Sequence, residues 1–290
     1  MNRTIRRGFG SRLFDTVNYI LLAAVAIATL YPFWDVMVSS FISVKEYVTE
    51  SFHLIPRELN LDSYRFIFRM DELWRAYKVT IIITVGGTVI NMILTTMTAY
   101  VLSKNLKGTR TVMFMIIFTM LFSGGMIPLY IVVRKLGIMN TLWALMLPTA
   151  IQTWNLIIMR SFFYTIPSSL EESARMDGAN DMTILIRIVL PLSLPVLATI
   201  SLFYAVFHWN EFFNAVMFIT TKRKWPLQLF LRAMLFEAEA STQSGGDDPS
   251  LLGMPIKMAS IAVATVPIMC AYPFFQRYFV KGVLVGAVKG

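Results

Sequence analysis

Long apolar runs are the feature that most constrains the fold of this chain. A helix that crosses the hydrocarbon core of a bilayer needs about 20 mostly apolar residues, and six segments reach that length. We predict spans at residues 14–39, 79–102, 111–133, 142–163, 188–219 and 258–280. The sequence therefore predicts one all-α transmembrane domain over residues 1–290, built as a bundle of six helices.

Two of the predicted spans carry residues that interrupt a helix. Gly124, Gly125 and Pro128 lie within the third, which should kink or break there. The fifth is long and starts among Pro191 and Pro195, so we expect it to be bent or tilted.

Composition supports a membrane protein and excludes several other classes. The chain is 56% hydrophobic and 15% charged, whereas soluble domains are about a quarter charged. Its net charge of +9 could indicate a nucleic-acid partner, but basic loops beside anionic lipid explain it more simply. We therefore expect contact with membrane lipid and none with nucleic acid. Cys270 is the single cysteine, so no intrachain disulfide is possible, and no Cys or His cluster predicts a metal site.

The basic residues predict an orientation, although their total is balanced between the two sides. Four arginines precede the first span, and residues 103–110 hold three basic residues and no acidic one. The positive-inside rule gives most weight to short loops and to the first helix. We therefore expect a multi-pass protein of the bacterial plasma membrane with both termini in the cytoplasm.

Residues 168–192 lie between the fourth and fifth spans and are too charged to be a span themselves. Ser169 and Glu172 have the spacing of a capping box, and Glu171 and Arg175 that of an i,i+4 ion pair. Gly178 can end this first helix in the left-handed conformation. Asn180 can then cap a second helix. We predict two short helices on the cytoplasmic face of the membrane.

The same residues resemble the EAA loop of ABC-importer permeases. The resemblance is carried by Glu172, Ser173, Ala174, Asp177, Gly178, Ile188, Leu190 and Pro191. Ser173 stands where the family usually has alanine. In that family the loop forms coupling helices that dock on an ATP-hydrolysing subunit, so the resemblance implies this role for these residues. Asp177-Gly178-Ala179 is similar to the carbohydrate-importing branch.

Further stretches resemble sugar-importer permeases. They are Pro128-Leu129-Tyr130, Leu136-Gly137-Ile138 and Asn140-Thr141 after the third span, and Val280-Lys281-Gly282 and Gly286–Gly290 at the C-terminus. The tail resembles one that reaches between two ATPase subunits in the maltose importer. The resemblance implies a type I importer permease that works with a second permease chain, two ATPase subunits and an extracytoplasmic solute-binding protein.

The chain itself shows no motif for catalysis. It lacks a GxxxxGK[ST] phosphate-binding loop, and His53 and His208 are far apart in the sequence. We therefore expect a transport subunit that is not an enzyme and holds no cofactor. ATP and magnesium are expected on the partner ATPase subunits.

Polar residues inside predicted spans are candidates for the substrate path, because such residues face the bundle interior or a wet cavity. The best cluster is His208, Trp209, Asn210 and Glu211 with Asn214, and the secondary candidates are Gln152, Trp154, Asn155 and Asn91. Sugars bind to aromatic faces and hydrogen-bonding groups, and these residues supply both. Alternatively, Trp209 and Trp154 are interfacial anchors and Glu211 is a structural partner of a neighbouring span.

These observations predict half of the translocation pathway of an ATP-driven importer for carbohydrate, in particular an oligosaccharide. The alternative is a secondary transporter driven by an ion gradient, but no inverted repeat is evident. Lys222, Arg223 and Lys224 lie on the predicted outer side, against the usual bias. They could steer an acidic oligosaccharide such as a uronate or alginate-type oligomer, dock on the binding protein, or contact lipid headgroups.

Overall fold

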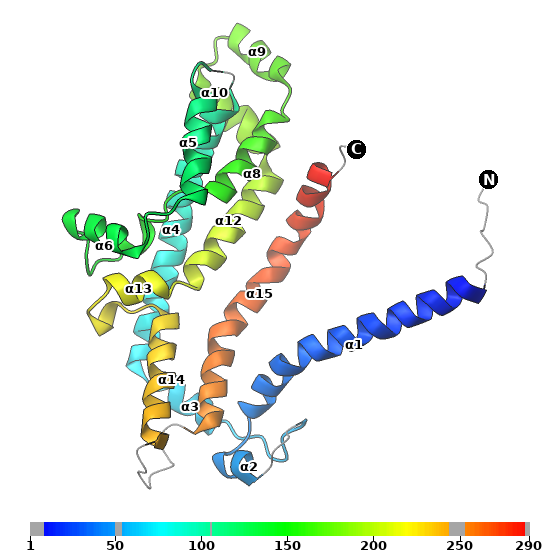
Figure 1. Cartoon of the computed structure of the whole chain (residues 1–290), viewed down its shortest axis with the longest axis vertical. Coiled ribbons are helices and arrows are strands. Elements are labelled where there is room, and N and C mark those ends of the chain that lie inside the picture. The colour runs from blue at the N-terminus through cyan, green and yellow to red at the C-terminus, as the bar shows by residue number, and fades with distance from the viewer. Residues whose placement is uncertain (1–8, 50–53, 105, 244–252, 288–290) are drawn as a thin grey trace. The chain divides into compact units, whose positions relative to one another are not determined.

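The computed structural model describes residues 9–49, 54–104, 106–243 and 253–287, and in these ranges the chain is helical with no β-strand (Figure 1). The α-helices are α1 (Phe9–Ser39), α2 (Val44–Thr49), α3 (Asp62–Phe68), α4 (Asp71–Ser103), α5 (Thr109–Leu121), α6 (Met126–Lys135), α7 (Trp143–Met146), α8 (Thr153–Tyr164), α9 (Ser168–Met176), α10 (Asp181–Ile184), α11 (Leu190–Leu192), α12 (Leu194–Trp209), α13 (Phe213–Phe218), α14 (Leu227–Gln243) and α15 (Met254–Ala287). A π-helical turn, η1 (Leu185–Val189), and a 3₁₀ turn, η2 (Lys222–Lys224), complete the described elements. The all-α prediction is therefore confirmed.

Internal contacts divide the chain into two compact groups, which are described separately. The first comprises Met1–Arg69 with Leu235–Val263, and the second comprises Met70–Met234 with Ala264–Gly290. A single domain over residues 1–290 stays a prediction.

Two described helical segments are long and apolar enough to cross a bilayer alone, Leu13–Ser39 and Asp71–Ser103. Two bent pairs reach the same length and composition only when each pair is taken as one span. These are Thr109–Leu121 with Met126–Lys135, and Asp181–Leu192 with Leu194–Trp209. By length and composition, the described helices thus support up to four spans. The predicted number of six stays a prediction.

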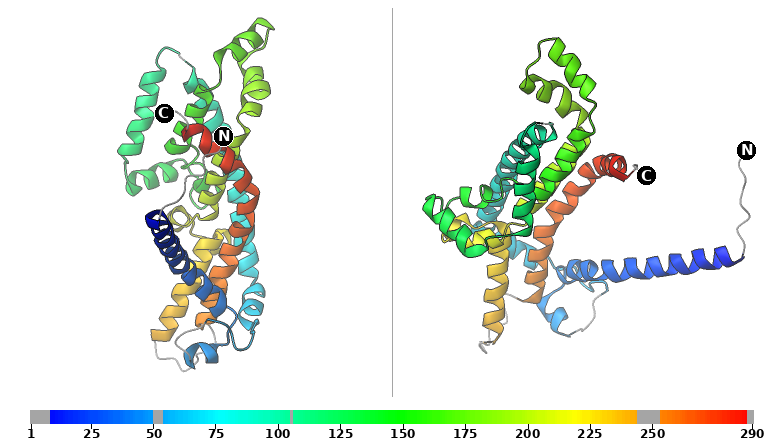
Figure 2. Two further views of the ribbon diagram at one scale, coloured as in Figure 1. Left: turned by 90° about the vertical axis from the view of Figure 1, so that its right-hand side faces the viewer. Right: turned by 45° about the horizontal axis from the view of Figure 1, so that its top comes forward.

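In the larger group, α4 lies beside α8 and α12, and both views of Figure 2 show these three helices running together. Their shared core is aliphatic and aromatic, with Leu156, Met159, Ile200 and Tyr204 almost fully buried. Lipid is as apolar as leucine, so packing and interhelical hydrogen bonds hold such helices together. One of these bonds joins Thr95 Oγ1 of α4 to the hydroxyl of Tyr204 on α12, at 2.7 Å.

The fourth predicted span is not one continuous helix, so the expectation of a helix over residues 142–163 is wrong. After the single turn of α7, residues 147–152 are irregular, and α8 begins only at Thr153. Pro148 explains the break, because proline removes a backbone donor and clashes with the preceding turn. Asn91 Nδ2 donates to the Thr149 carbonyl at 2.7 Å, and the Gln152 N–H donates to the Tyr204 hydroxyl at 3.1 Å. Side chains of α4 and α12 thereby satisfy the backbone of the broken segment.

The bends predicted for the third and fifth spans are confirmed. The axes of α5 and α6 differ by 115°, and Gly125 between them has a φ of 86°. Residues 181–192 and α12 meet at 86° around Ser193. Pro191 and Pro195 flank that bend and supply no N–H to the helical ladder, and a π-helical turn, η1, lies just upstream.

In the smaller group, hydrogen bonds order the segment that follows α1. Trp34 Nε1 donates to the Leu54 carbonyl at 2.8 Å, and the hydroxyls of Ser40 and Tyr64 lie 2.8 Å apart. This segment therefore contains the short helices α2 and α3 with tertiary contacts.

The close approach of α4 to α12 generates a stability prediction. A Cβ on Gly87 would lie 2.4 Å from His208 Nε2, and His208 is fully buried and bonded to Asn91 Oδ1 at 3.2 Å. Gly87→Ala should therefore displace the imidazole and destabilise the purified protein by about 1–3 kcal/mol, the usual cost of overpacking. Thermal unfolding in detergent measures this loss.

Gly86→Ala is the matched control, since it makes the same chemical change one residue away. Its Cβ would meet only Met146 Sδ at 3.4 Å, and a methionine side chain adapts easily. Equal unfolding temperatures for the two variants would contradict the role of Gly87 in this contact.

Candidate functional site

The charged loop, residues 168–192, begins with α9, whose first helical residue follows Pro167 directly. The predicted capping box is wrong, because no side chain caps this helix. Ser169 already lies within the first turn, so its hydroxyl is past the position from which it could accept the N–H bonds of a cap. Pro167, at the N-cap position, has no side-chain acceptor to offer, and Ser168 and Ser169 are exposed.

The ion pairs of α9 reach other elements instead of lying along the helix. Glu171 pairs with Lys104, which follows α4, and Arg175 pairs with Asp181 at the start of α10. The predicted Glu171–Arg175 pair is therefore wrong, because partners outside the helix are closer. Burial, followed by the nearby Arg175 guanidinium, lowers the pKa of the Lys104 ammonium, and Asp181 acts in the opposite direction.

The turn between α9 and α10 has the predicted geometry. Gly178 has a φ of 82°, its N–H donates to the Arg175 carbonyl at 3.0 Å, and the Ala179 N–H donates to the Ala174 carbonyl at 3.0 Å. This is a Schellman motif, in which the left-handed residue is usually glycine. Asn180 Oδ1 then accepts the Thr183 N–H at 2.8 Å, which confirms the predicted cap of the second helix.

The residues of the EAA-like pattern divide between two faces. Ala174, Ile188 and Leu190 pack against the core formed by α4, α8 and α12. The members of the pattern that stay exposed are Glu172, Ser173, Asp177, Gly178 and Pro191. The loop thus packs on the core with one face and is exposed on the other.

Met176 is a surface residue that the sequence reasoning missed. Its side chain is 88% exposed, at the end of α9 beside Asp177 and Gly178. Single exposed apolar side chains are common on protein surfaces, so its exposure alone does not mark an interface. The signal in the sequence was a methionine on the polar face of an otherwise charged helix.

Of the residues proposed for the substrate path, the structure joins Glu211 and Asn214 directly. Glu211 is buried, and its two oxygens accept the backbone N–H and Nδ2 of Asn214, each at 3.0 Å. Trp209 Nε1 donates to the Ala264 carbonyl at 3.2 Å. Asn210 is exposed, and its Nδ2 donates to the Val206 carbonyl at 2.8 Å. Within this chain these four residues therefore have structural partners.

The candidates on α8 point in different directions. Asn155 is buried and donates to Gln152 Oε1 at 3.2 Å, whereas Trp154 is 61% exposed. The assignment of the path residues stays a prediction.

The basic run at η2 is partly structural. Lys224 Nζ donates to the Asn140 carbonyl at 2.6 Å, and Lys222 lies over the ring of Trp225 at 5.6 Å. Asn140 has a φ of 56° and bonds through its side chain to the hydroxyl and N–H of Thr221. It therefore ties the segment after α6 to the segment after α13. Lys222 and Arg223 are the exposed members of the run.

Comparison with known proteins decides the family. Residues 88–285 match the family described as binding-protein-dependent transport system inner membrane component. The chain belongs to this family. The match covers α4 beyond Gly87, the charged loop and α12, so the EAA-like resemblance is confirmed for the part of the chain that carried it.

Relatives of the permease include two from Bacillus and Halalkalibacterium. The polygalacturonan/rhamnogalacturonan transport system permease protein YtcP of Bacillus subtilis is 47% identical, over 97% of this chain and 99% of that protein. The arabinooligosaccharides transport system permease protein AraQ of Halalkalibacterium halodurans is 28% identical, over 95% of each chain.

A solved structure has the same fold. It is a bacterial ABC transporter involved in the import of the acidic polysaccharide alginate. Its matching chain superposes on the permease with a TM-score of 0.86 at 34% identity, and covers 94% of this chain and 98% of that one. The permease is therefore a transport subunit of an ATP-driven carbohydrate importer, and the ion-gradient alternative is disfavoured.

The geometry of Gly178 predicts how the permease responds to a side chain there. Gly178→Asp should abolish substrate uptake while the chain still inserts into the membrane, because the change strains the turn and places a carboxylate on the exposed face. Uptake by cells and co-purification of the ATPase subunits measure the two effects.

Gly137→Asp is the control for backbone strain alone. Gly137 has a φ of 70° with open space around it, and lies outside the charged loop. It should keep ATPase association. Normal uptake by Gly178→Asp, with ATPase subunits still bound, would rule out coupling through this turn.

Proposed function

We propose that this permease forms half of the translocation pathway of an importer for acidic oligosaccharides and that its charged loop is the contact with the ATPase subunits. The observation that carries the second part is the two-sided character of that loop. Its apolar members pack on the core, and its polar members and Met176 are exposed. The Glu171–Lys104 pair ties it to the end of α4, and the Arg175–Asp181 pair joins its two helices. Movement of a partner bound to the exposed face would therefore pass directly to the spans.

The assembly proposed around the permease has a second permease chain, two ATPase subunits and a solute-binding protein. The charged loop and both termini would face the cytoplasm, where ATP is. The C-terminal residues 288–290, part of the tail that resembles the maltose-importer permease, lie outside the described residues, as do Arg3, Arg6 and Arg7. ATP and magnesium would bind the partner ATPase subunits, and the permease would have no catalytic role of its own.

An acidic substrate is supported by two independent observations. The relatives YtcP and the alginate transporter are named for galacturonan, rhamnogalacturonan and alginate, which are carbohydrates with uronic acids. In the permease, η2 carries two exposed cations, Lys222 and Arg223, at a position predicted to be outside. Cations at an entrance raise the local concentration of anionic ligands.

The direct test of the proposed function is ATP hydrolysis by the purified assembly in lipid nanodiscs. Binding protein loaded with an oligogalacturonate should stimulate hydrolysis several-fold more than binding protein loaded with a neutral oligosaccharide of equal length. Uptake with the same selectivity should follow in cells. Stimulation by neutral sugars alone would contradict the proposal of an acidic substrate. If no loaded binding protein stimulates hydrolysis, the proposal of an importer is wrong.

The contribution of η2 is tested by replacing only the exposed cations. Lys222→Gln with Arg223→Gln should lower uptake of the acidic oligosaccharide at low salt, spare the neutral one, and lose this selectivity at high salt. Equal loss for both sugars would instead indicate docking on the binding protein. Lys224→Gln is the control, because its bond to the Asn140 carbonyl is structural and its loss should affect both sugars alike.

A further inference from the structure

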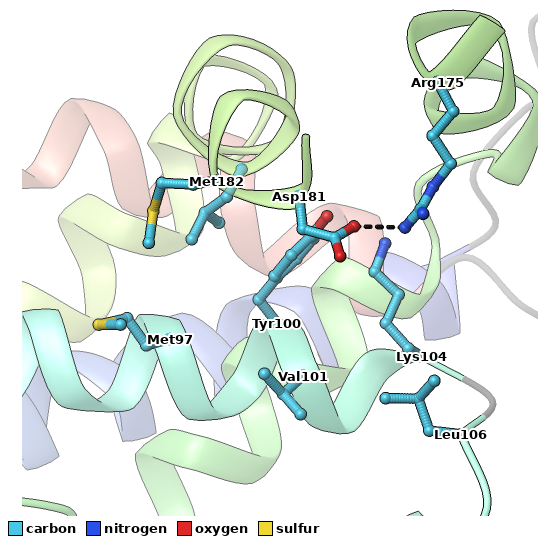
Figure 3. Close-up of a pocket in the computed structure, with 9 residues that line it drawn as sticks. Met97, Tyr100, Val101, Lys104, Leu106, Arg175, Asp181 and Met182 are labelled. Atoms are coloured by element: carbon cyan, nitrogen blue, oxygen red, sulfur yellow. Dashed lines mark hydrogen bonds and ion pairs between the residues drawn. The ribbon is translucent and has the colours of Figure 1, made fainter. Parts of the chain in front are cut away.

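A pocket of about 360 Å³ lies between the last turns of α4 and the charged loop (Figure 3). Its walls combine apolar and polar side chains from α4, the segment after it, α9, α10 and η1. The lining residues are Met97, Tyr100, Val101, Lys104, Leu106, Arg175, Asp181, Met182 and Leu185. We call it the Tyr100 pocket.

The polar groups of the Tyr100 pocket meet at one end. In Figure 3 the ends of Tyr100, Lys104, Asp181 and Arg175 lie together, and the sulfur atoms of the two methionines lie away from them. Tyr100 is only 6% exposed, and its hydroxyl has no hydrogen-bond partner in the described part of the chain. A buried hydroxyl without a partner costs free energy, so a ligand that accepts a hydrogen bond from it would be stabilised there.

The cations at this end keep donors that an anion could use. Each cation of the pocket has one carboxylate partner, Glu171 for Lys104 and Asp181 for Arg175, so the local charge is balanced. Lys104 and Arg175 each bond to one carboxylate oxygen, yet an ammonium has three donors and a guanidinium has five. Arg175 also lowers the pKa of Lys104, as burial does, so an anion between the two cations would relieve their repulsion.

The other end of the pocket indicates what kind of anion fits. Met97, Val101 and Met182 line it with apolar side chains that are 44%, 53% and 51% exposed. Met97 and Val101 lie on α4, a helix long and apolar enough to span a bilayer, and Lys104 follows that helix directly. Along α4 the surface thus changes from apolar to cationic, in the order in which a lipid changes from acyl chain to phosphate. A water-soluble anion would leave the apolar wall uncovered.

We propose that the Tyr100 pocket binds an anionic phospholipid, with its phosphate held by Tyr100, Lys104 and Arg175 and an acyl chain along Met97, Val101 and Met182. This inference rests on the proposed function, because it requires the charged loop to lie at the membrane surface. The lipid would bridge α4 to α9 and α10, the same elements that the Glu171–Lys104 and Arg175–Asp181 pairs join. Its occupancy would therefore regulate how firmly the loop is coupled to the spans.

The experiment uses the complete importer, with binding protein and substrate, in nanodiscs of phosphatidylcholine containing increasing fractions of phosphatidylglycerol. Substrate-stimulated ATP hydrolysis should rise with the phosphatidylglycerol fraction, and native mass spectrometry should detect retained phosphatidylglycerol on the permease. Inorganic phosphate added to pure phosphatidylcholine nanodiscs should not replace the lipid. If it does, the site binds free phosphate and the lipid proposal is wrong.

Tyr100→Phe is the decisive variant, because it removes a hydroxyl that has no partner within the described chain. A purely structural role of Tyr100 predicts no change. The proposal predicts that the phosphatidylglycerol fraction needed for half-maximal stimulation rises about tenfold, the usual effect of losing one hydrogen bond to a charged group. Val101→Trp should fill the pocket and abolish both the lipid response and lipid retention.

Lys107→Gln is the matched control, since it removes an exposed cation near α4 that does not line the pocket. It should respond to phosphatidylglycerol as the unmodified importer does. An unchanged lipid response in Tyr100→Phe and Val101→Trp would overturn the lipid site while leaving the importer intact. Loss of substrate stimulation in every lipid mixture would instead count against the proposed function.

Discussion

The need to satisfy backbone polar groups away from water is the constraint on which the larger group of helices depends. Within a bilayer an N–H or C=O group without a partner costs several kcal/mol, so irregular backbone survives only where protein covers it. Residues 147–152 meet this condition because Asn91 and Tyr204 reach the segment from α4 and α12. Thr95 and His208 in turn hold those two side chains in place. The polar residues of these helices are therefore what allows the fourth predicted span to be broken.

This arrangement also explains why intramembrane polar residues are ambiguous signals. Asn91, Asn155 and Glu211 have the chemistry of sugar-binding groups, yet each is buried with a partner inside the chain. Residues that hold helices together and residues that line a substrate path are of the same types. Only the exposure of the side chain distinguishes the two roles. Trp154 and Asn210 are the exposed members of the set, and Trp209 and Asn214 are half-buried.

Local chemistry made part of the fold and the site predictable. Gly178 and Asn180 act on the residues next to them, so their roles in the turn and the second cap could be inferred from spacing alone. The same holds for the breaks near Gly125 and Pro191. The ion pair of Glu171 could not be predicted in this way, because Lys104 follows a helix distant in the sequence that only the fold brings close. The break at Pro148 had a visible signal, but the partners that make it tolerable come from α4 and α12.

The junction of α4 with the charged loop has a mechanical consequence. Lys104 is held by Glu171, and Arg160 Nε donates to the Leu102 carbonyl at 2.8 Å, so the end of α4 is clamped by both α8 and α9. The helix beyond that clamp is 33 residues long and has no proline. At 1.5 Å per residue it is a rod of about 50 Å, and tilting it by about 10° at the clamp would displace its far end by about 9 Å. A displacement of a few ångströms at the loop would thus be magnified by leverage at the opposite end of the helix.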